Sequence, residues 1–157
     1  MLVAFLLIGV QLLAESKFLI DIDKKTIASV SMKDTLPQLR EKFGSKNVTT
    51  ATENLEGESQ IIIIINLNGH KVIKHWNHLS TKDPIFRTKE DIGVGSSVAE
   101  FAKYYGKPSV GEGEGGPYLN FTSARGTEFQ VEVSIKCIDF ATGSVNYQKC
   151  IVKEILL

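Results

Sequence analysis

Apolar residues recur along this chain with two spacings, one typical of helices and one typical of strands. The helical spacing of three to four residues occurs twice, at Leu36, Leu39 and Phe43 and again at Val98, Phe101, Ala102 and Tyr105. Both stretches begin with a hydroxyl residue, Thr35 or Ser97, followed three positions later by Gln or Glu. That arrangement is a capping box, whose side chains satisfy free amide hydrogens at a helix start. The pattern predicts short helices over 35–43 and 97–105.

Strand patterns follow each predicted helix. Residues 129–136 alternate apolar and polar side chains, which predicts an antiparallel strand with one buried and one solvated face. The dipeptide Asn68-Gly69 lies between two apolar runs and predicts a β-hairpin. The run Ile61–Ile65 is apolar at every position, which is typical of a central strand that is covered on both faces.

The two helix-plus-strand segments align at a constant offset. Thr35 and Ser97 are 62 positions apart, as are Gly44 and Gly106. Self-similarity at a fixed period indicates a supersecondary unit that is used twice. We therefore predict an α+β fold, a tandem repeat of a short helix plus antiparallel strands with the helices packed on one face of the sheets. The first unit covers residues 17–78, and the second covers residues 79–157 with a C-terminal strand.

The first residues of the chain are apolar and uncharged. Residues 2–14 match the apolar core of a signal peptide in length and are too few for a stable membrane span. We therefore predict that residues 1–14 are a signal peptide and that the protein is periplasmic or secreted. No Lys or Arg precedes the apolar run, so a buried strand or helix is the alternative. In an oxidising compartment Cys137 and Cys150 can form a disulfide, and two separate buried thiols are the alternative.

Composition and motifs limit the classes of function. The chain carries 18 Lys and Arg and 18 Asp and Glu, so its formal net charge is zero. It therefore lacks the basic surface that general nucleic-acid binding and docking on anionic membranes require. His75 and His78 are candidate metal ligands, but no third ligand follows at a metal-binding spacing. No nucleophile stands in a known catalytic motif. The sequence thus favours a protein without enzymatic activity or cofactor.

The Ile61–Ile65 run has a second interpretation. If one face of this strand is left uncovered, Ile62 and Ile64 form part of an apolar patch, and large exposed apolar patches mark interaction sites. Trp76, the single tryptophan, closes the next predicted strand. Ile62, Ile64 and Trp76 are therefore the candidate residues of a partner-binding surface.

The second predicted helix lies in a stretch that resembles a known signature. It reads Ile92-Gly93-Val94-Gly95-Ser96-Ser97, then Glu100-Phe101, then Tyr105-Gly106-Lys107-Pro108. The stretch resembles small bacterial envelope modules, including the outer-membrane assembly lipoproteins (SmpA/OmlA) and the β-lactamase-inhibitor-protein-like family. The resemblance implies a repeated folding element in an exported protein, and it assigns no active-site residue.

The function expected from these observations is that of an exported, non-enzymatic module that binds a protein or an envelope component. Two alternatives stand beside it. A metal-assisted hydrolase would use His75 and His78. A small-ligand carrier in the periplasm would need a closed cavity between sheet and helices.

Overall fold

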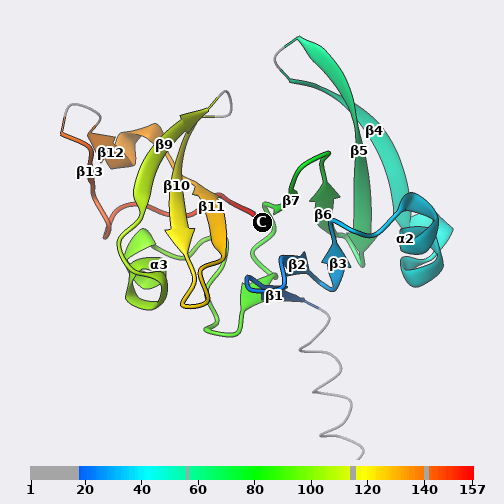
Figure 1. Ribbon diagram of the computed structural model, residues 1–157, viewed down its shortest axis with the longest axis horizontal. Helices are drawn as coiled ribbons and strands as arrows, with labels where there is room; N and C mark the ends of the chain where they lie inside the picture. Colours follow the sequence, from blue (N-terminus) through cyan, green and yellow to red (C-terminus); the bar gives the residue numbers. More distant parts are fainter. Residues whose placement is uncertain (1–17, 56, 114–115, 140–141) are drawn as a thin grey trace, which may run out of the picture.

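An eight-stranded antiparallel sheet is the largest element of the computed structural model, which describes residues 18–55, 57–113, 116–139 and 142–157 (Figure 1). Its strands are β4 (Val48–Leu55), β5 (Glu58–Leu67), β6 (His70–Lys74), β7 (Leu79–Thr81), β9 (Ser109–Gly113), β10 (Gly116–Thr122), β11 (Glu128–Glu132) and β14 (Glu154–Leu156). Their spatial order is β4-β5-β6-β7-β14-β11-β10-β9. The C-terminal strand β14 pairs with β7 on one side and β11 on the other, and thereby joins β4–β7 and β9–β11 in one sheet. The predicted signal peptide, residues 1–14, lies outside the described residues.

The remaining described elements are short. A four-stranded sheet has the order β3-β2-β1-β8, in which β1 and β8 are parallel. Its strands are β1 (Leu19–Asp21), β2 (Thr26–Ile27), β3 (Val30–Ser31) and β8 (Arg87–Thr88), and a separate hairpin contains β12 (Ile138–Asp139) and β13 (Ser144–Val145). The helices are α2 (Leu36–Phe43) and α3 (Val98–Tyr105), with single 3₁₀ turns η1 (Ser45–Asn47) and η2 (Ile135–Cys137).

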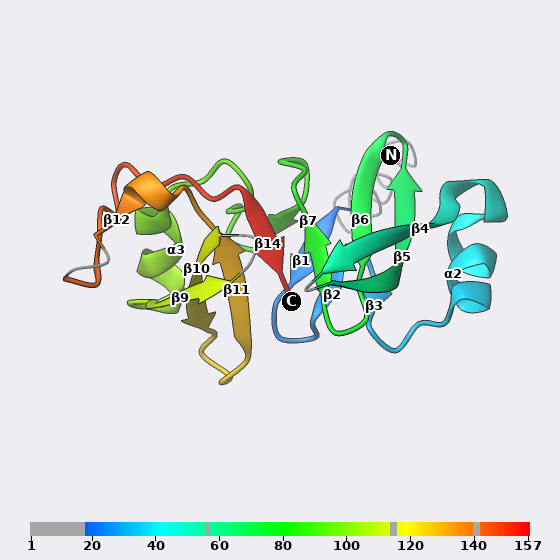
Figure 2. The same ribbon diagram turned by 90° about the horizontal axis from the view of Figure 1, so that it is seen from above.

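The large sheet is curved, and its two faces have different surroundings. β4 and β5 rise at one end and β9, β10 and β11 at the other, with β7 and β14 between them (Figure 1). Both helices and the four-stranded sheet lie on the same side of this curve, as the view from above also shows (Figure 2). We call that side the outer face and the opposite side the inner face. The inner face carries no described helix or second sheet (Figures 1 and 2).

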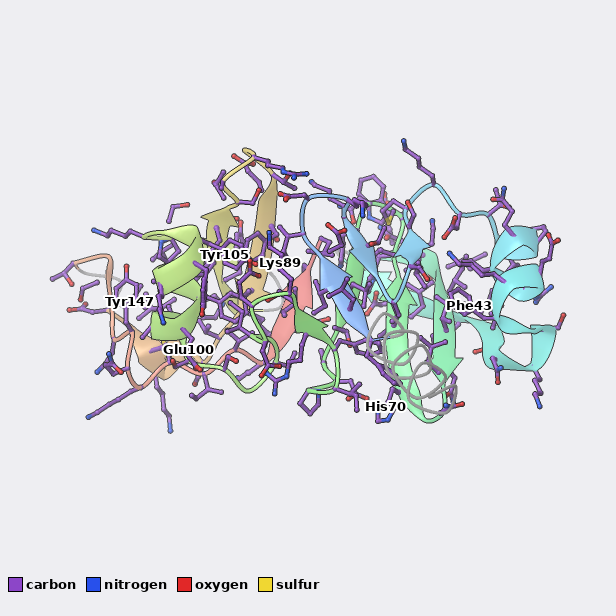
Figure 3. All side chains as sticks on the ribbon, turned by 90° about the horizontal axis from the view of Figure 1, so that it is seen from below. Phe43, His70, Lys89, Glu100, Tyr105 and Tyr147 are labelled. Atoms are coloured by element: carbon purple, nitrogen blue, oxygen red, sulfur yellow. A yellow bond between two sulfur atoms is a disulfide. The ribbon has the colours of Figure 1, made fainter. Side chains whose placement is uncertain are left out.

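The hydrophobic core fills the outer face. Its fully buried side chains come from the large sheet, the small sheet and both helices, and include Ile20, Ile27, Leu39, Ile65, Leu79, Phe86, Phe101, Leu119, Phe121 and Ile155. Phe43 points from α2 and Tyr105 from α3 into this layer (Figure 3). Tyr105 packs edge-to-face on Phe129 of β11, with 4.9 Å between the ring centroids. Short helices are held by such packing because helices of this length are marginal alone.

The two predicted helices are present, but the predicted fold class is wrong. Thr35 and Ser97 cap α2 and α3 with the predicted capping boxes. However, strands make up 45% of the structure and helices 17%, so the protein is mostly β. The physical reason is burial: α2 buries only Leu39 fully, whereas several antiparallel sheets supply most of the core. The structure is therefore not an α+β tandem repeat built by helix packing.

The division into units 17–78 and 79–157 stays a prediction. In the order of the sheet, its boundary lies between β6 and β7.

A disulfide joins Cys137 of η2 to Cys150 near the C-terminus. The segment it closes returns to the start of α3, where the Val98 amide donates to the Cys150 carbonyl at 2.8 Å. The Ala99 amide likewise donates to the Tyr147 carbonyl at 3.0 Å. The cross-link therefore fixes the segment that satisfies two free amides of α3.

Candidate functional site

The inner face can be read residue by residue from the pairing of the strands. One row of directly opposed residues crosses all eight strands, in the order Thr49, Ile64, Ile73, Ser80, Leu156, Gln130, Asn120 and Ser109. The residues next to this row, such as Val48, Ile65 and Leu79, point to the other side of the sheet and belong to the core. Because side chains alternate between faces along a strand, the whole row lies on the inner face.

The middle of this row is apolar and its ends are polar. Ile64, Ile73 and Leu156 are half-buried, and Ile62, in the neighbouring row, is only 8% exposed. None of these four side chains belongs to the hydrophobic core cluster on the outer face. They form what we call the inner patch. An apolar centre with a polar rim is the usual composition of a protein–protein interface.

A hydrogen-bonded chain of polar side chains borders the inner patch. His75 bonds through Nε2 to Ser80 Oγ at 3.2 Å and through Nδ1 to Glu53 Oε2 at 3.0 Å. The order serine, histidine, carboxylate is that of a hydrolase triad. Ser80, however, is 0% exposed, and its strand is paired on both sides, with Ile73 and with Leu156. A substrate carbonyl cannot reach this hydroxyl, so these hydrogen bonds serve to hold the side chains of Glu53, His75 and Ser80 in place on the inner face.

The two candidate metal ligands lie side by side. The His75 amide donates to the His78 carbonyl at 2.9 Å, so the turn at Trp76 and Asn77 places both rings together. Their planes are stacked with 4.1 Å between the centroids and 15° between the planes. Ring lone pairs lie in the ring planes, so the nitrogens of a stacked pair do not converge on one ion. The described residues contain no group of three or more His, Cys, Asp or Glu placed to hold a metal.

The electrostatics of this region follow from burial. Partial burial, with the neighbouring His75 charge, lowers the pKa of His78 to about 4. His78 is therefore neutral at physiological pH. Its Nδ1 lies 2.6 Å from Asn77 Oδ1.

A pair of carboxylates stands further along the inner face. Glu132 of β11 and Glu154 of β14 are directly opposed in the sheet, and Lys82 Nζ lies 3.2 Å from Glu154 Oε2. Burial and the Glu154 charge raise the pKa of the Glu132 carboxyl. The same Glu154 charge raises the pKa of Lys82. The polar part of the inner face thus combines the Lys82–Glu154 ion pair with a like-charge contact between Glu132 and Glu154.

The predicted partner-surface residues divide between two places. Ile62 and Ile64 lie in the inner patch, whereas Trp76 is at the tip of the β6–β7 turn and is 67% exposed. Ile73, Leu156 and Glu53 were missed by sequence reasoning. The adjacent apolar residues Val72 and Ile73 would have suggested that one of them faces away from the core, but nothing local shows that Leu156, 83 positions after Ile73, joins the same row.

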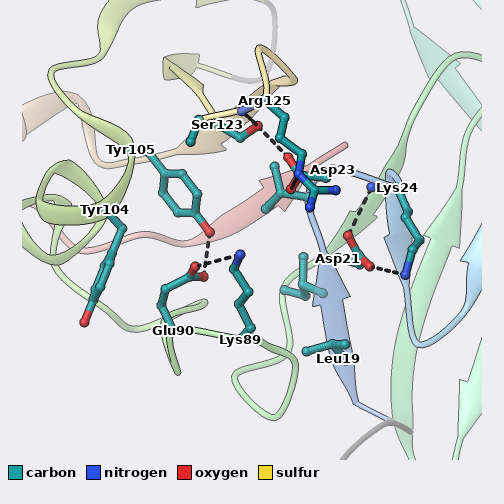
Figure 4. A pocket seen from close by; sticks show the side chains of 13 residues that line it. Leu19, Asp21, Asp23, Lys24, Lys89, Glu90, Tyr104, Tyr105, Ser123 and Arg125 are labelled. Atoms are coloured by element: carbon teal, nitrogen blue, oxygen red, sulfur yellow. Dashed lines mark hydrogen bonds and ion pairs between the residues drawn. The ribbon is translucent and has the colours of Figure 1, made fainter.

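A separate pocket of about 260 Å³ lies between β1, α3 and the β10–β11 turn (Figure 4). Three ion pairs line it: Asp21 with Lys24 at 2.9 Å, Asp23 with Arg125 at 3.5 Å, and Glu90 with Lys89 at 3.6 Å.

Two hydroxyl groups complete the polar lining of this pocket. The Tyr105 hydroxyl donates to Glu90 at 2.9 Å, and the Ser123 hydroxyl donates to Asp23 at 2.6 Å. Burial and the Glu90 bond raise the pKa of Tyr105. Each carboxylate that lines the pocket therefore already has a partner within the protein.

No helix of the described residues is long and apolar enough to cross a membrane. No protein-family model, curated protein or solved structure matches this chain.

Proposed function

We propose that this protein is an exported, non-enzymatic binding module whose inner patch docks a protein partner. The observation that carries the proposal is the registered row of side chains, apolar at Ile64, Ile73 and Leu156 and polar at both ends. An antiparallel sheet with one solvated face is normally polar on that face. Apolar residues at its centre are explained if a partner covers them.

A protein partner fits this surface better than a small molecule does. The inner patch spans several strands of a broad sheet, and its charged neighbours Glu53, Lys82 and Glu154 are held in fixed pairs. Fixed polar groups around an apolar centre give register and specificity to a macromolecular interface. Export is supported by the apolar leader of the sequence and by the Cys137–Cys150 disulfide, since disulfides persist in oxidising compartments.

The proposal is tested by affinity capture with matched variants. Wild type, Ile64→Glu and Thr50→Glu are immobilised and exposed to extract of the source organism, and retained proteins are quantified by mass spectrometry. Ile64 lies in the inner patch, and Thr50 is an exposed residue on the outer face of β4. We expect one protein to be retained by wild type and Thr50→Glu and to lose at least about tenfold in affinity with Ile64→Glu, the effect of removing a central contact.

The outcome that contradicts the proposal is equally defined. The proposal is wrong if wild type and Ile64→Glu retain the same proteins. It is also wrong if Thr50→Glu loses the retained protein as completely as Ile64→Glu does. Thermal unfolding of all three proteins is measured in parallel, so that a folding defect is recognised.

The pocket favours a second candidate, a carrier of a small zwitterion. The pocket is lined by three carboxylates and three cationic side chains. A ligand with one positive and one negative group can bind between the two members of an ion pair, so that each charge keeps a partner of opposite sign. The test is an NMR titration with alanine as the probe. Saturable shifts of the Tyr104 and Tyr105 ring signals are expected, and these should vanish in Glu90→Gln but persist in the surface control Lys46→Gln. Absence of saturable shifts would rule this candidate out.

A further inference from the structure

β5 is an interior strand of the large sheet, yet part of its length has a neighbour on one side only. β4 pairs with β5 from Leu55 opposite Glu58 to Val48 opposite Ile65. β6 pairs with β5 only from Ile63 to Leu67. In the described part of the chain, no strand continues β6 alongside Glu58–Ile62, which we call the open edge.

The register shows which backbone groups face this opening. The turn Asn68-Gly69 joins β5 to β6 and makes Leu67 and His70 the closing hydrogen-bonded pair. In an antiparallel ladder every second residue directs its N–H and C=O to the same neighbour. Ile63 therefore bonds to β6, and Ile61 and Ser59 direct their groups to the same side, beyond the point where β6 has ended.

Two exposed apolar side chains flank these groups. Ile61 is 71% exposed, and Trp76, at the tip of the β6–β7 turn, is 67% exposed. β6 leaves the ladder after Lys74, and the turn at Trp76 and Asn77 leads into β7, so Trp76 lies at the end of the opening and not opposite Ile61. Apart from Glu58 at its far end, the open edge carries no charged residue. Such an edge is a template for pairing with another chain, and proteins normally protect it with charge, proline or a covering element.

The outer edge of the sheet, along β4, offers a contrast. Its exposed side chains next to Thr52 are Thr50 and Asn54, which are polar. Thr52 lies directly opposite Ile61 and directs its backbone groups to that outer edge. Of these two edges, the open edge of β5 is the one that combines free backbone groups with large apolar side chains.

We propose that the open edge receives an extended segment of the protein partner as an added β-strand, in line with β6 and ending against Trp76. This inference rests on the proposed function and specifies how that partner is held. Backbone bonds to Ser59 and Ile61 provide the register, and the partner residue that pairs with Ile61 is apolar. A second copy of the chain fits poorly, because its β5 has only the same five open residues before the end of its own β6, where Lys74 pairs with Ile63.

The experiment uses a phage-displayed library of random twelve-residue peptides, panned on the full chain. Recovered peptides are synthesised and their affinities measured by fluorescence anisotropy against wild type, Ile61→Pro and Thr52→Pro. Proline removes one outward N–H in each variant, from the open edge or from the β4 edge. We expect Ile61→Pro to weaken binding by at least about tenfold, the scale of one lost hydrogen bond with its desolvation cost, and Thr52→Pro to change it less than about twofold.

Two further measurements keep the inference falsifiable. A peptide N-methylated at the residue that donates to the Ile61 carbonyl should lose binding to the unaltered wild type, which tests the bond without changing the fold. Leu156→Glu should leave peptide affinity unchanged, because Leu156 of the inner patch lies on β14, three strands away from the open edge of β5, so failure of the proposed function is recognised independently. Recovery of no peptide, equal binding to Ile61→Pro, or a concentration-dependent dimer that Ile61→Pro abolishes would overturn the inference.

Discussion

The imidazole rings of His75 and His78 are stacked, with 4.1 Å between their centroids. His75 is fixed by Glu53 and Ser80, so His78 packs on a ring that cannot turn away. Stacking and burial favour the neutral form of His78, because a charged ring would be poorly solvated there. The protonation state of His78 is thus coupled to the packing of side chains on the inner face.

We expect acidification to weaken the fold through His78. The pKa of His78 is lowered from 6.5 to about 4, so the unfolded chain binds this proton first as the pH falls. The free energy of unfolding should therefore decrease between about pH 6.5 and pH 4, and this decrease should be smaller in His78→Gln. Urea unfolding of both proteins at several pH values provides the measurement. An identical pH dependence in the two proteins would contradict the assignment.

The Glu132–Glu154 pair predicts the opposite sign. Burial and the Glu154 charge raise the pKa of Glu132, so its ionised form at neutral pH destabilises the folded state. Glu132→Gln should stabilise the protein at pH 7 by up to about 1 kcal/mol, the scale of one partly screened like-charge contact. Glu128→Gln, at an exposed position of the same strand, is the matched control. If both substitutions shift the unfolding temperature equally, the pair has no special role.

The helices could be predicted from sequence because their signals are local. Thr35 and Ser97 each stand three positions before the side chain that completes the cap. β9 could not be predicted in this way, since its glycines are typical of a loop. In the structure Gly111 lies opposite Tyr118, and a Cβ at Gly111 would come within 2.2 Å of that ring. Glycine is therefore required where an aromatic side chain lies across a neighbouring strand.

The candidate site shows the same limit. Ile62 and Ile64 could be identified from an uninterrupted apolar run. A strand with one solvated face normally alternates apolar and polar residues, so a run without polar residues indicates that both faces of the strand are apolar. Leu156 could not be assigned to the same patch, since its place depends on β14 pairing with β7 and β11. Long-range register of this kind is set by the whole fold and leaves no local pattern. The open edge of β5 was missed for the same reason, because it depends on where β6 ends.

Substitution of the two capping residues tests how much each helix cap contributes to the free energy of unfolding. Ser97→Ala and Thr35→Ala should each lower the free energy of unfolding by about 1 kcal/mol, because each leaves an amide of the first helical turn without its acceptor. Ser45→Ala, at an exposed position outside both helices, should change it by less than about 0.5 kcal/mol. Denaturant unfolding distinguishes these values. A cap substitution that costs no more than the control would show that packing alone holds that helix.

The disulfide should stabilise both the whole protein and the start of α3. Closing a loop of 13 positions is worth about 3 kcal/mol in the chain-entropy account, so reducing the Cys137–Cys150 bond should lower the free energy of unfolding by about that amount. The amides of Val98 and Ala99, which donate to the segment next to Cys150, should then exchange hydrogen faster than the amide of Leu39 in α2. Hydrogen exchange with and without reductant measures both effects, and a Cys137→Ser, Cys150→Ser double variant should no longer respond to reductant. A local effect of the cross-link must appear first in α3, because the cross-linked segment accepts hydrogen bonds from the first amides of that helix. Equal acceleration of exchange at Val98 and Leu39 would therefore mean that the disulfide acts only on global stability.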